Sequence, residues 1–427
     1  MKLKQREVDV AVIGGGPAGL AAGIKAKEEG AEHVLILERA EELGGLLPQC
    51  VHSGWGLLYF NEDLTGPEYG ARFIEKANDT KVDFQLESMV IGLTPDREIR
   101  TASSKYGYSI LKPKAVVLAM GCRERSRGAL NIPGTRPGGV FTAGTAQRWV
   151  NIQGFIPGKR IVMLGSGDIG MIMARRLTLE GAKIELVAEI LPYIGGLVRN
   201  QVQCLRDFNI PLLLEHTVTD IHGEDRVEAV TVAAVDSHRN PIPSTERKVE
   251  CDSLLLSVGL IPENEVSLLA GVKLSPITGG PIVDEFRQTN VPGIFAAGNC
   301  THVNDLVDNV SFESELAGAS AAHFAAGERL EKGKITLKAG RNIRYIVPQT
   351  ITAERDVTLY MRVSEPEEMV RLKVGDIMTT KALRIVMPAE MQSIPLSLSQ
   401  LSKLKEGTTE LTVDVEPIKK REDKKDA

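Results

Sequence analysis

Two stretches of the chain share one hydrophobic pattern, in which an apolar run leads into a glycine-rich turn and then into a helical stripe of apolar residues. The first is VDVAVIGGGPAGLAAGIKAKEEG, at residues 8–30, and the second is RIVMLGSGDIGMIMARRLTLEG, at residues 160–181. A short apolar run bounded by glycine indicates a buried strand, and the stripe indicates a helix. The pattern therefore predicts two strand–turn–helix units, which are the building blocks of α/β domains.

The C-terminal part of the chain has a different pattern, because apolar and polar residues alternate there. The alternation is clear in VTLYMRV, VRLKV, ALRIVM and LTVDV, which are separated by proline, glycine and charged residues. A period of two indicates strands with one buried face. We predict a small antiparallel β domain over about 338–416, reached through the polar linker GERLEKGKITLKAGRN and followed by a disordered, solvated tail at 417–427. The domain either caps the core or docks a partner, and the sequence does not decide between these roles.

The first glycine-rich turn has the G-x-G-x-x-G spacing at Gly14, Gly16 and Gly19. In this context the first glycine permits the tight turn, the second lets the backbone approach a pyrophosphate, and the third lets the helix pack on the strand. The phosphate would lie at the helix N-terminus, where free N–H groups favour an anion. The next strand ends at Glu38, which is placed to accept hydrogen bonds from a ribose.

The second turn repeats this arrangement at Gly165, Gly167 and Gly170, and Glu189 follows at the same spacing. The chain therefore carries two dinucleotide-binding units. Glu189 would repel a 2′-phosphate, and no arginine follows it closely, which favours NAD(H) over NADP(H) in this unit. Two dinucleotides in one chain indicate a flavin beside a nicotinamide, because hydride transfer needs a donor and an acceptor.

Composition narrows the class of protein. The chain has 427 residues, of which 43% are hydrophobic and 25% charged, as expected for two or three globular domains. A net charge of −5 argues against a nucleic-acid binder, which would carry a basic face. We find no apolar run long enough for a membrane span and no signal-peptide core, so we expect a cytoplasmic protein.

The five cysteines are spread along the chain and form no CxxC pair. We therefore expect no disulfide framework, no structural zinc site, no iron–sulfur cluster on a local cysteine group, and no other metal site. The cysteines are Cys50, Cys122, Cys204, Cys251 and Cys300.

Together with these motifs, four further segments resemble the flavoproteins with two dinucleotide-binding domains, the class of thioredoxin and glutathione reductases. AVVLAMG (115–121) resembles the segment where the chain leaves the FAD domain, and DSLLLSVGLIPEN (252–264) the strand by which it returns. NVPGIFAAGNC (290–300) resembles the motif along the flavin ribityl chain, with Asn299 in place of Asp. VDNVSFESELAGASAAHFAAG (307–327) resembles the helix whose N-terminus faces the flavin.

This resemblance implies an α/β fold with two Rossmann-like dinucleotide-binding domains, the NAD domain inserted in the FAD domain, and FAD and NAD(H) as cofactors. The implied ranges are 1–121 and 258–335 for the two parts of the FAD domain and 122–257 for the NAD domain. The implied FAD-binding residues are Gly14, Gly16, Pro17, Ala18, Gly19, Glu38, Arg39, Gly45, Met89, Ala119, Gly121, Gly298, Asn299 and Ser311, and the NAD-binding residues are Gly165, Gly167, Asp168, Ile169, Gly170, Glu189 and Gly259.

Two segments support a narrower resemblance, GGLLPQCVHSGWGLLYFNEDLTGPEYG (44–70) and GCRERSRGALNIPGTRPGGVFTAGTAQ (121–147). They resemble the FAD/NAD subunits of dye-linked proline dehydrogenase, opine oxidase and hydrogen cyanide synthase, and the oxidoreductases that accompany glycerol-3-phosphate dehydrogenases. Many of these relatives carry a cysteine-rich 2Fe–2S segment near the C-terminus, which this sequence does not contain. The resemblance is therefore greatest to the glycerol-3-phosphate-associated kind, and it implies a partner dehydrogenase subunit or a small redox protein.

Cys50 stands alone where the disulfide reductases of this class carry a redox pair, so a local dithiol mechanism is excluded. Cys50 and His52 are candidate catalytic residues, because an imidazolium could stabilise a thiolate beside the flavin. The alternative is that Cys50 packs as a small buried apolar residue.

Other polar residues near these motifs have simpler interpretations. Surface charge is the favoured role of Arg123, Arg125 and Arg127, with contacts to a nucleotide phosphate or an anionic substrate as the alternative. His302 is expected to be structural, Cys300 to pack near the flavin, and Glu313 and Glu315 to lie on a solvated helix face.

Three functions remain open from the sequence. The first is hydride or electron transfer between NADH and a second acceptor or partner dehydrogenase subunit, with glycerol-3-phosphate dehydrogenase as the candidate. The second is a stand-alone NADH oxidase or peroxidase that uses Cys50. The third is a flavoprotein that binds NAD(H) without turnover. The direction of electron flow stays open, as does the oligomeric state, a homo-oligomer included.

Overall fold

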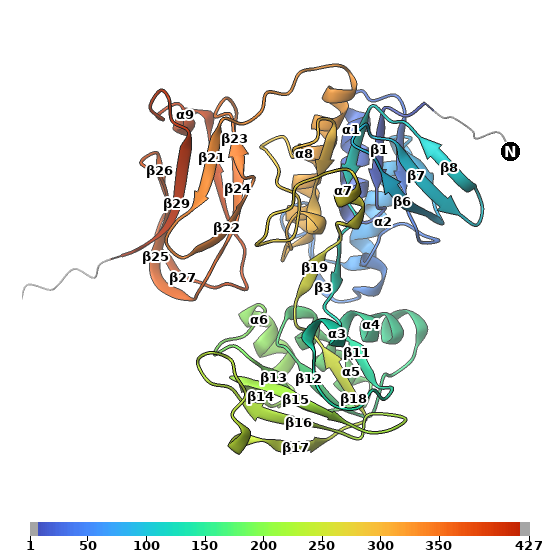
Figure 1. Ribbon diagram of the computed structural model, residues 1–427, viewed down its shortest axis with the longest axis vertical. Coiled ribbons are helices and arrows are strands. Elements are labelled where there is room, and N and C mark those ends of the chain that lie inside the picture. The colour runs from blue at the N-terminus through green and yellow to red at the C-terminus, as the bar shows by residue number, and fades with distance from the viewer. Residues whose placement is uncertain (1–6, 419–427) are drawn as a thin grey trace, which may run out of the picture.

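A computed structural model describes residues 7–418 and divides them among three groups of sheets (Figure 1). The N-terminal group is built on a five-stranded sheet in which all neighbouring strands run parallel. Its strands are buried apolar runs, as expected where helices cover both faces of a parallel sheet. In spatial order they are β20 (Ile294–Ala296), β9 (Ala115–Leu118), β1 (Val10–Ile13), β2 (Val34–Leu37) and β5 (Asp83–Gln85).

Helices α1 (Pro17–Glu28) and α8 (Val307–Ala325) pack closely against each other over this sheet. Gly318 makes the close approach possible, because a Cβ atom there would lie 2.1 Å from the carbonyl oxygen of Ala22. The last strand of the sheet, β20, comes from far along the chain, so this domain closes only after the second unit has been completed. Its other elements are η1 (Leu47–Gln49), β3 (Ser53–Trp55), β4 (Leu64–Thr65), α2 (Gly66–Asp79), the meander β6 (Ser88–Leu93), β7 (Ile99–Ser103) and β8 (Gly107–Leu111), α7 (Glu265–Leu269) and η5 (Gly298–Cys300).

The second group, below the first in Figure 1, repeats the five-stranded parallel design. The chain enters it beside β10 (Cys122–Glu124) and returns through β19 (Leu260–Pro262), and these two strands pair antiparallel. The sheet order is β11 (Val140–Thr142), β18 (Ser253–Leu256), β12 (Arg160–Leu164), β13 (Lys183–Glu189) and β14 (Leu212–Leu214). The remaining elements are α3 (Arg127–Leu130), α4 (Ala143–Arg148), η2 (Trp149–Gln153), α5 (Asp168–Leu179), α6 (Val198–Asn200), η3 (Gln201–Arg206), β15 (His216–His222), β16 (Ala229–Ala234), η4 (Pro243–Thr245) and β17 (Arg247–Glu250).

The C-terminal group is a β domain with its own apolar core, which includes Leu359, Met361 and Val413. Ordered as in the chain, it consists of β21 (Ile335–Ala339), β22 (Ile343–Val347), β23 (Thr350–Ile351), β24 (Val357–Val363), β25 (Glu367–Val374), β26 (Met378–Thr379), β27 (Leu383–Val386), β28 (Gln392–Leu396), α9 (Leu398–Leu401) and β29 (Glu410–Pro417). They form one six-stranded and one three-stranded sheet, with antiparallel pairing everywhere except between β21 and β29.

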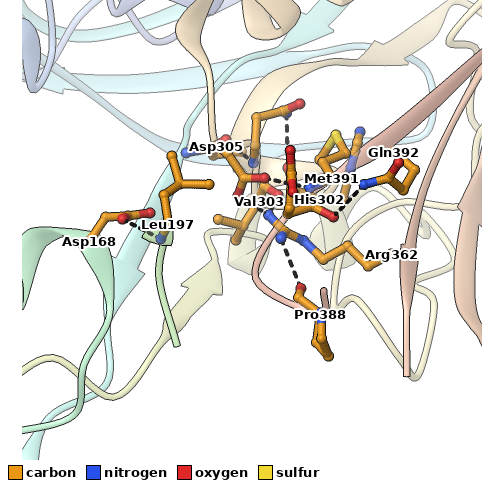
Figure 2. A network of polar contacts seen from close by, with 12 residues as sticks. Asp168, Leu197, His302, Val303, Asp305, Arg362, Pro388, Met391 and Gln392 are labelled. Carbon is orange, nitrogen blue, oxygen red and sulfur yellow. Dashed lines mark hydrogen bonds and ion pairs between the residues drawn. The ribbon is translucent and has the colours of Figure 1, made fainter. Parts of the chain in front are cut away.

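The C-terminal domain docks against the first group through a charged contact (Figure 2). Arg362 of β24 forms a short hydrogen-bonded ion pair with Asp305 and also donates to the carbonyl oxygens of Val303 and Pro388. Asp305 additionally accepts from the backbone N–H of Met391 at 2.6 Å. Both charged side chains are only 13% exposed, so the contact is buried and its partners are matched. The loop after Gly298 is thereby fixed to the C-terminal domain.

The predicted fold class is confirmed, with two Rossmann-like parallel sheets and a C-terminal β domain. The predicted linker was wrong in part, because Ile335 to Ala339 form strand β21, in which Ile335 and Leu337 are buried. Two apolar residues at alternate positions were enough to make a strand within a segment rich in lysine and glycine. The predicted tail lies outside the described residues from 419 onward. No helix in residues 7–418 combines the length and the apolar character needed to cross a bilayer.

Candidate functional site

The first glycine-rich turn is held together by backbone approaches that only glycine allows. Gly14 has a φ of +111°, and a Cβ atom there would lie 2.3 Å from the carbonyl oxygen of Ala119. A Cβ at Gly19 would lie 1.7 Å from the carbonyl oxygen of Gly14. Helix α1 therefore starts directly against the carboxyl ends of β1 and β9, which is where nucleotides bind in open α/β sheets.

Glu38 clamps this turn from the end of β2. Its carboxylate accepts a hydrogen bond from the N–H of Gly15 at 2.6 Å and another from the N–H of Ala40 at 2.8 Å. The side chain is 8% exposed, so its position is fixed by charge-assisted hydrogen bonds rather than by solvent. Arg39, the next residue, is exposed.

Several predicted residues from distant parts of the chain converge on the same turn. A Cβ at Gly45 would lie 2.9 Å from the Cα of Gly16, and a Cβ at Gly298 would lie 2.8 Å from the Cβ of Ala18. The Asn299 side chain accepts a hydrogen bond from the N–H of Asn304 at 2.9 Å, so this amide braces the loop that follows. The structure thus brings residues of the first turn, the Gly-Gly loop and η5 into one place.

The space beside Gly16 fits a pyrophosphate. A Cβ at Gly16 would meet nothing nearer than the Cα of Gly45, at 3.7 Å, and no side chain caps the N-terminus of α1. Pro17 follows at the first helical position, where its missing N–H costs nothing. The amides of the first turn of α1 are therefore left for an anion, as in known dinucleotide sites.

Other predicted residues of the first unit lie further from the turn. Ser311, in α8, shares a 2.7 Å hydrogen bond with the hydroxyl of Tyr69. The side chain of Met89 is 46% exposed on β6, although the neighbouring Ser88 donates its N–H to the carbonyl oxygen of Glu38. Gly121 has a φ of +72° at the end of the segment after β9.

The second turn has the same geometry as the first. Gly165 has a φ of +94°, and a Cβ there would lie 2.1 Å from the carbonyl oxygen of Ser257. Glu189 accepts from the N–H of Ser166 at 2.8 Å and from the N–H of Leu191 at 3.0 Å. A Cβ at Gly170 would lie 2.6 Å from the Cβ of Ser257. Gly167 caps α5 without a side-chain hydrogen bond of its own, and Gly170 donates its N–H to the Ser257 hydroxyl at 3.0 Å, so the amides of Asp168 and Ile169 are the ones left for an anion.

The repeat extends beyond the fingerprint that sequence reasoning identified. In the first unit Gly44 donates its N–H to the carbonyl oxygen of Gly15, and in the second Gly195 donates its N–H to the hydroxyl of Ser166. Asp168 closes the second loop by accepting from the N–H of Leu197 at 2.8 Å. The signal that could have revealed this is a second Gly-Gly-Leu, placed after Glu189 as the first is placed after Glu38.

Two further NAD-site candidates border this turn. Ile169 packs with the apolar core beneath α5. Gly259 has a φ of +100° and accepts a hydrogen bond from the N–H of Arg125 where the two crossover strands meet. Ile169 thus lies in the helix between β12 and β13, and Gly259 lies where the chain leaves the second sheet.

The contacts of Cys50 and His52 do not support a thiolate pair. The Cys50 thiol is 4% exposed and donates to the carbonyl oxygen of Leu46 at 3.3 Å, and burial raises its pKa to about 12. The Nδ1 atom of His52 instead lies 2.9 Å from the carbonyl oxygen of Ser53. Gln147, which lies 3.8 Å from the Cys50 sulfur, was missed from the sequence. The buried-residue alternative fits this geometry.

Two of the arginines after Gly121 make contacts at the point where the chain crosses between the first and second groups. Arg123 forms ion pairs with Glu263 and Glu265, while Arg127 donates to backbone carbonyl oxygens, among them that of Ile132. Their contacts are therefore structural.

The expectation of a solvated helix face was wrong for Glu313. This side chain is 1% exposed and accepts from His302 Nε2 at 2.8 Å. Burial alone would raise the pKa of Glu313, but the charges of His302 and Arg287 hold it below its usual value. Glu315 accepts a short hydrogen bond from the hydroxyl of Tyr59. Glu313 was misjudged because its partners come from loops that the helical period does not reveal, whereas Glu315 is half-buried.

These geometries agree with comparisons to known proteins. A family model described as pyridine nucleotide-disulphide oxidoreductase matches residues 8–326. The chain belongs to this family. It is therefore an oxidoreductase, of a family that typically binds FAD and NAD(P)H.

Curated relatives of this oxidoreductase include components of larger enzymes. One of the subunits of opine oxidase from Agrobacterium tumefaciens (strain Ach5) is 26% identical over 312 residues, which cover 68% of this chain and 61% of the relative. The HcnB subunit of hydrogen cyanide synthase from Pseudomonas protegens is 25% identical over 314 residues, which cover 67% of this chain and 65% of the relative. The chain thus spans less than two thirds of the length of these two relatives.

Solved structures confirm the fold. The thioredoxin reductase of T. acidophilum matches with a TM-score of 0.62 and 25% identity, and covers 75% of this chain and 99% of its own. The L-proline dehydrogenase of P. horikoshii matches with a TM-score of 0.53 and 21% identity, and the match covers 78% of this chain and 58% of the dehydrogenase.

Proposed function

We propose that this oxidoreductase binds FAD at the first glycine-rich turn and NADH at the second, and that it passes electrons between NADH and a second acceptor. When bound, FAD supplies the redox chemistry, as a hydride acceptor that can release its electrons one at a time or in pairs. The protein supplies positions for the two nucleotides and the electrostatic surroundings.

The observation that carries this proposal is the presence of two matching turns in a chain whose nearby cysteine, Cys50, is buried, which raises the pKa of its thiol. Both turns leave helix N-terminal amides for a pyrophosphate, at Gly16 and at Gly167. The five cysteines in residues 7–418 are all free, and the printed contacts of the Cys50 sulfur are with Leu46 and Gln147 rather than with another cysteine. Electrons from the flavin would therefore leave without a disulfide relay.

The carboxylates of Glu38 and Glu189 would determine which nucleotide each site binds. Glu38 and Glu189 each hold a carboxylate beside the space over a helix N-terminus, where a ribose hydroxyl can donate to it. A 2′-phosphate would meet the negative charge of Glu189, which favours NADH over NADPH. Gly298 and Asn299 would lie along the flavin side chain, and Ser311 near the start of α8 beside the ring.

The electron partner is inferred from the relatives and from the resemblance of the Cys50 loop. Two of the relatives are named as subunits, of opine oxidase and of hydrogen cyanide synthase. We propose a partner dehydrogenase subunit, with a glycerol-3-phosphate dehydrogenase as the first candidate, or a small redox protein in its place. The C-terminal β domain, fixed to the loop after Gly298 by the Asp305–Arg362 pair, is the candidate surface for it.

The proposal is tested with the purified chain and the candidate dehydrogenase, alone and mixed. The chain alone should contain FAD and should reduce an artificial dye with NADH, whereas glycerol 3-phosphate alone should leave its flavin oxidised. Adding the dehydrogenase should make glycerol 3-phosphate reduce the flavin. Absence of FAD, or of dye reduction by NADH, would overturn the proposed activity, whereas failure of the mixture alone would overturn only the choice of partner.

A further inference from the structure

A buried arginine lies where α8 meets the C-terminal β domain. Arg287 is 2% exposed, and its Nε and Nη1 atoms have no hydrogen-bond partner among the described residues. Its nearest charge is Glu313, whose Oε1 lies 3.8 Å from Nη2, an ion pair too long for a hydrogen bond. Burying a guanidinium with unused donors is costly, so these donors call for an acceptor.

The guanidinium is held in a fixed position. Tyr360 of β24 packs its ring 5.6 Å from the guanidinium carbon, a cation–π contact across the domain junction. The backbone of Arg287 has a φ of +63°, in the left-handed region that residues other than glycine seldom adopt. Ala296 of β20 fixes this conformation by donating its N–H to the carbonyl oxygen of Arg287.

Arg287 and Glu313 line a cavity of about 530 Å³ between α8 and the C-terminal domain. This volume suits a small molecule. The opposite wall is formed by Thr358 and Tyr360 of β24 and by Gln400 of α9, so both domains contribute to the cavity.

We propose that this cavity binds a small carboxylate that carries a hydroxyl or ammonium group beside its carboxyl group. The planar fork of Arg287 suits a carboxylate, which can accept two parallel hydrogen bonds from it. The Oε2 atom of Glu313 has no hydrogen-bond partner within residues 7–418, and it can accept from the hydroxyl or ammonium group. The lining holds the acidic side chains of Glu285, Glu313 and Asp356 and the basic ones of Arg287 and Arg355, so its excess of negative charge disfavours a doubly charged phosphate.

Such a ligand would join the two parts of the molecule. It would contact Arg287 and Glu313 on the α8 side and the β24–α9 wall of the C-terminal domain on the other. Glu313 also lies in the same helix as Ser311, so a ligand here would act on α8 close to the proposed flavin site without entering it. The inference does not depend on which electron partner the protein uses.

The test is ligand-induced thermal stabilisation of the purified holoprotein, measured with L-lactate, glycine, propionate and inorganic phosphate at matched ionic strength. Because a ligand that binds only the folded state raises the melting temperature, lactate or glycine should raise it in a saturable way. Propionate, which lacks the second donor, should bind more weakly, and phosphate should have no specific effect. Comparing the shift with L-lactate and the shift with glycine also distinguishes a hydroxy acid from an amino acid as the preferred ligand.

Three variants assign the effect to the cavity. Arg287→Lys keeps the charge but loses the fork, and should weaken ligand binding at least tenfold. The melting-temperature shift of each variant is measured from that variant's own ligand-free value. Arg371→Lys, on the exposed part of β25, is the matched control and should bind as the unaltered protein does. If Arg287→Lys does not fold, Thr358→Trp fills the cavity from its wall and should abolish the shift. The proposal is overturned if neither lactate nor glycine stabilises the protein, or if Arg287→Lys or Thr358→Trp responds as the control does.

Discussion

Glu38 and Glu189 make the same contacts in the two halves of the molecule. Glu38 accepts from the N–H of Gly15, 23 residues before it, and Glu189 accepts from the N–H of Ser166, also 23 residues before it. Each carboxylate also accepts from the N–H two residues after itself. The two nucleotide sites therefore share one design, and matched substitutions can separate their roles.

Exchanging Glu189 for glutamine should affect only the nicotinamide nucleotide. Glu189→Gln removes the negative charge and one acceptor, and charge-assisted hydrogen bonds contribute about 1.5–3 kcal/mol each, so KM for NADH should rise about tenfold or more. Discrimination against NADPH should fall. Steady-state dye reduction with each nucleotide measures both effects.

Glu38→Gln is the matched control for this prediction. It should lower the FAD content of the purified protein, read from the visible flavin absorbance, and leave the ratio of NADH to NADPH activity unchanged. A change of nucleotide preference in Glu38→Gln, or its absence in Glu189→Gln, would contradict the assignment of the two sites.

Gly19→Ala should disrupt the first turn. The added Cβ would lie 1.7 Å from the carbonyl oxygen of Gly14, a backbone atom that cannot move aside, so we expect a loss of about 3 kcal/mol or more in the free energy of unfolding and little bound FAD. Gly128→Ala is the control, because its Cβ would meet only the Ser126 hydroxyl at 3.8 Å. Urea unfolding should show the control to be unchanged or slightly more stable.

The Cys50 thiol should be inert in the folded protein. With a pKa of about 12, on the order of one thiol in ten thousand is ionised at pH 8. Iodoacetamide at pH 8 should therefore leave Cys50 unlabelled until urea unfolds the chain, as peptide mass spectrometry can show.

Cys50→Ser should also keep dye reduction by NADH within about twofold, like the control Cys204→Ser, because neither thiol takes part in electron transfer. Rapid labelling of Cys50, or a loss of activity confined to Cys50→Ser, would revive the NADH oxidase or peroxidase alternative.

The Asp305–Arg362 pair should show strong coupling. Removing one partner leaves the other charge buried, which costs about 3–5 kcal/mol, so Arg362→Met alone should be severely destabilising. Adding Asp305→Asn should recover at least about 1 kcal/mol, since the unpaired carboxylate is then gone. Urea unfolding of the two single variants and the double variant measures the coupling, and simple additivity would contradict it.

Asp284 should make the fold sensitive to pH in the opposite sense from most carboxylates. Burial raises its pKa from 3.8 to about 6, so the folded state prefers the protonated form. The stability that this preference provides is complete below pH 3.8 and is lost as the pH rises through 6. Asp284→Asn should therefore stabilise the protein by up to about 3 kcal/mol at pH 7.5 and by much less at pH 4.5. An equal effect at both pH values would refute the shift.

The fold was largely predictable because its signals are local. The two turns, from Gly14 and from Gly165, follow buried strands and lead into helices, and each carries an acidic residue at one spacing. The strand at Ile335 was not predictable in the same way, because its polar neighbours look like a linker. Its pairing with β23 and with β29, the latter near the other end of the domain, stabilises it.

The polar contacts were far less predictable, because they join residues that are remote in sequence. Tyr59 meets Glu315 within the first group although 256 residues separate them, and Arg362 meets Asp305 only where the C-terminal domain docks. The environment of Cys50 is set by Gln147 of the second group, which no pattern near Cys50 indicates. Burial of Arg287 and Glu313 likewise depends on the C-terminal domain, whose docking the sequence did not decide.

The most direct test of the central claim is anaerobic addition of NADH, and separately of NADPH, to the purified protein while the visible flavin band is recorded. We predict rapid bleaching with NADH and little or none with NADPH, because hydride from the second site reduces the flavin at the first and Glu189 repels the 2′-phosphate. A flavin that neither nucleotide bleaches would contradict the proposed transfer from NADH.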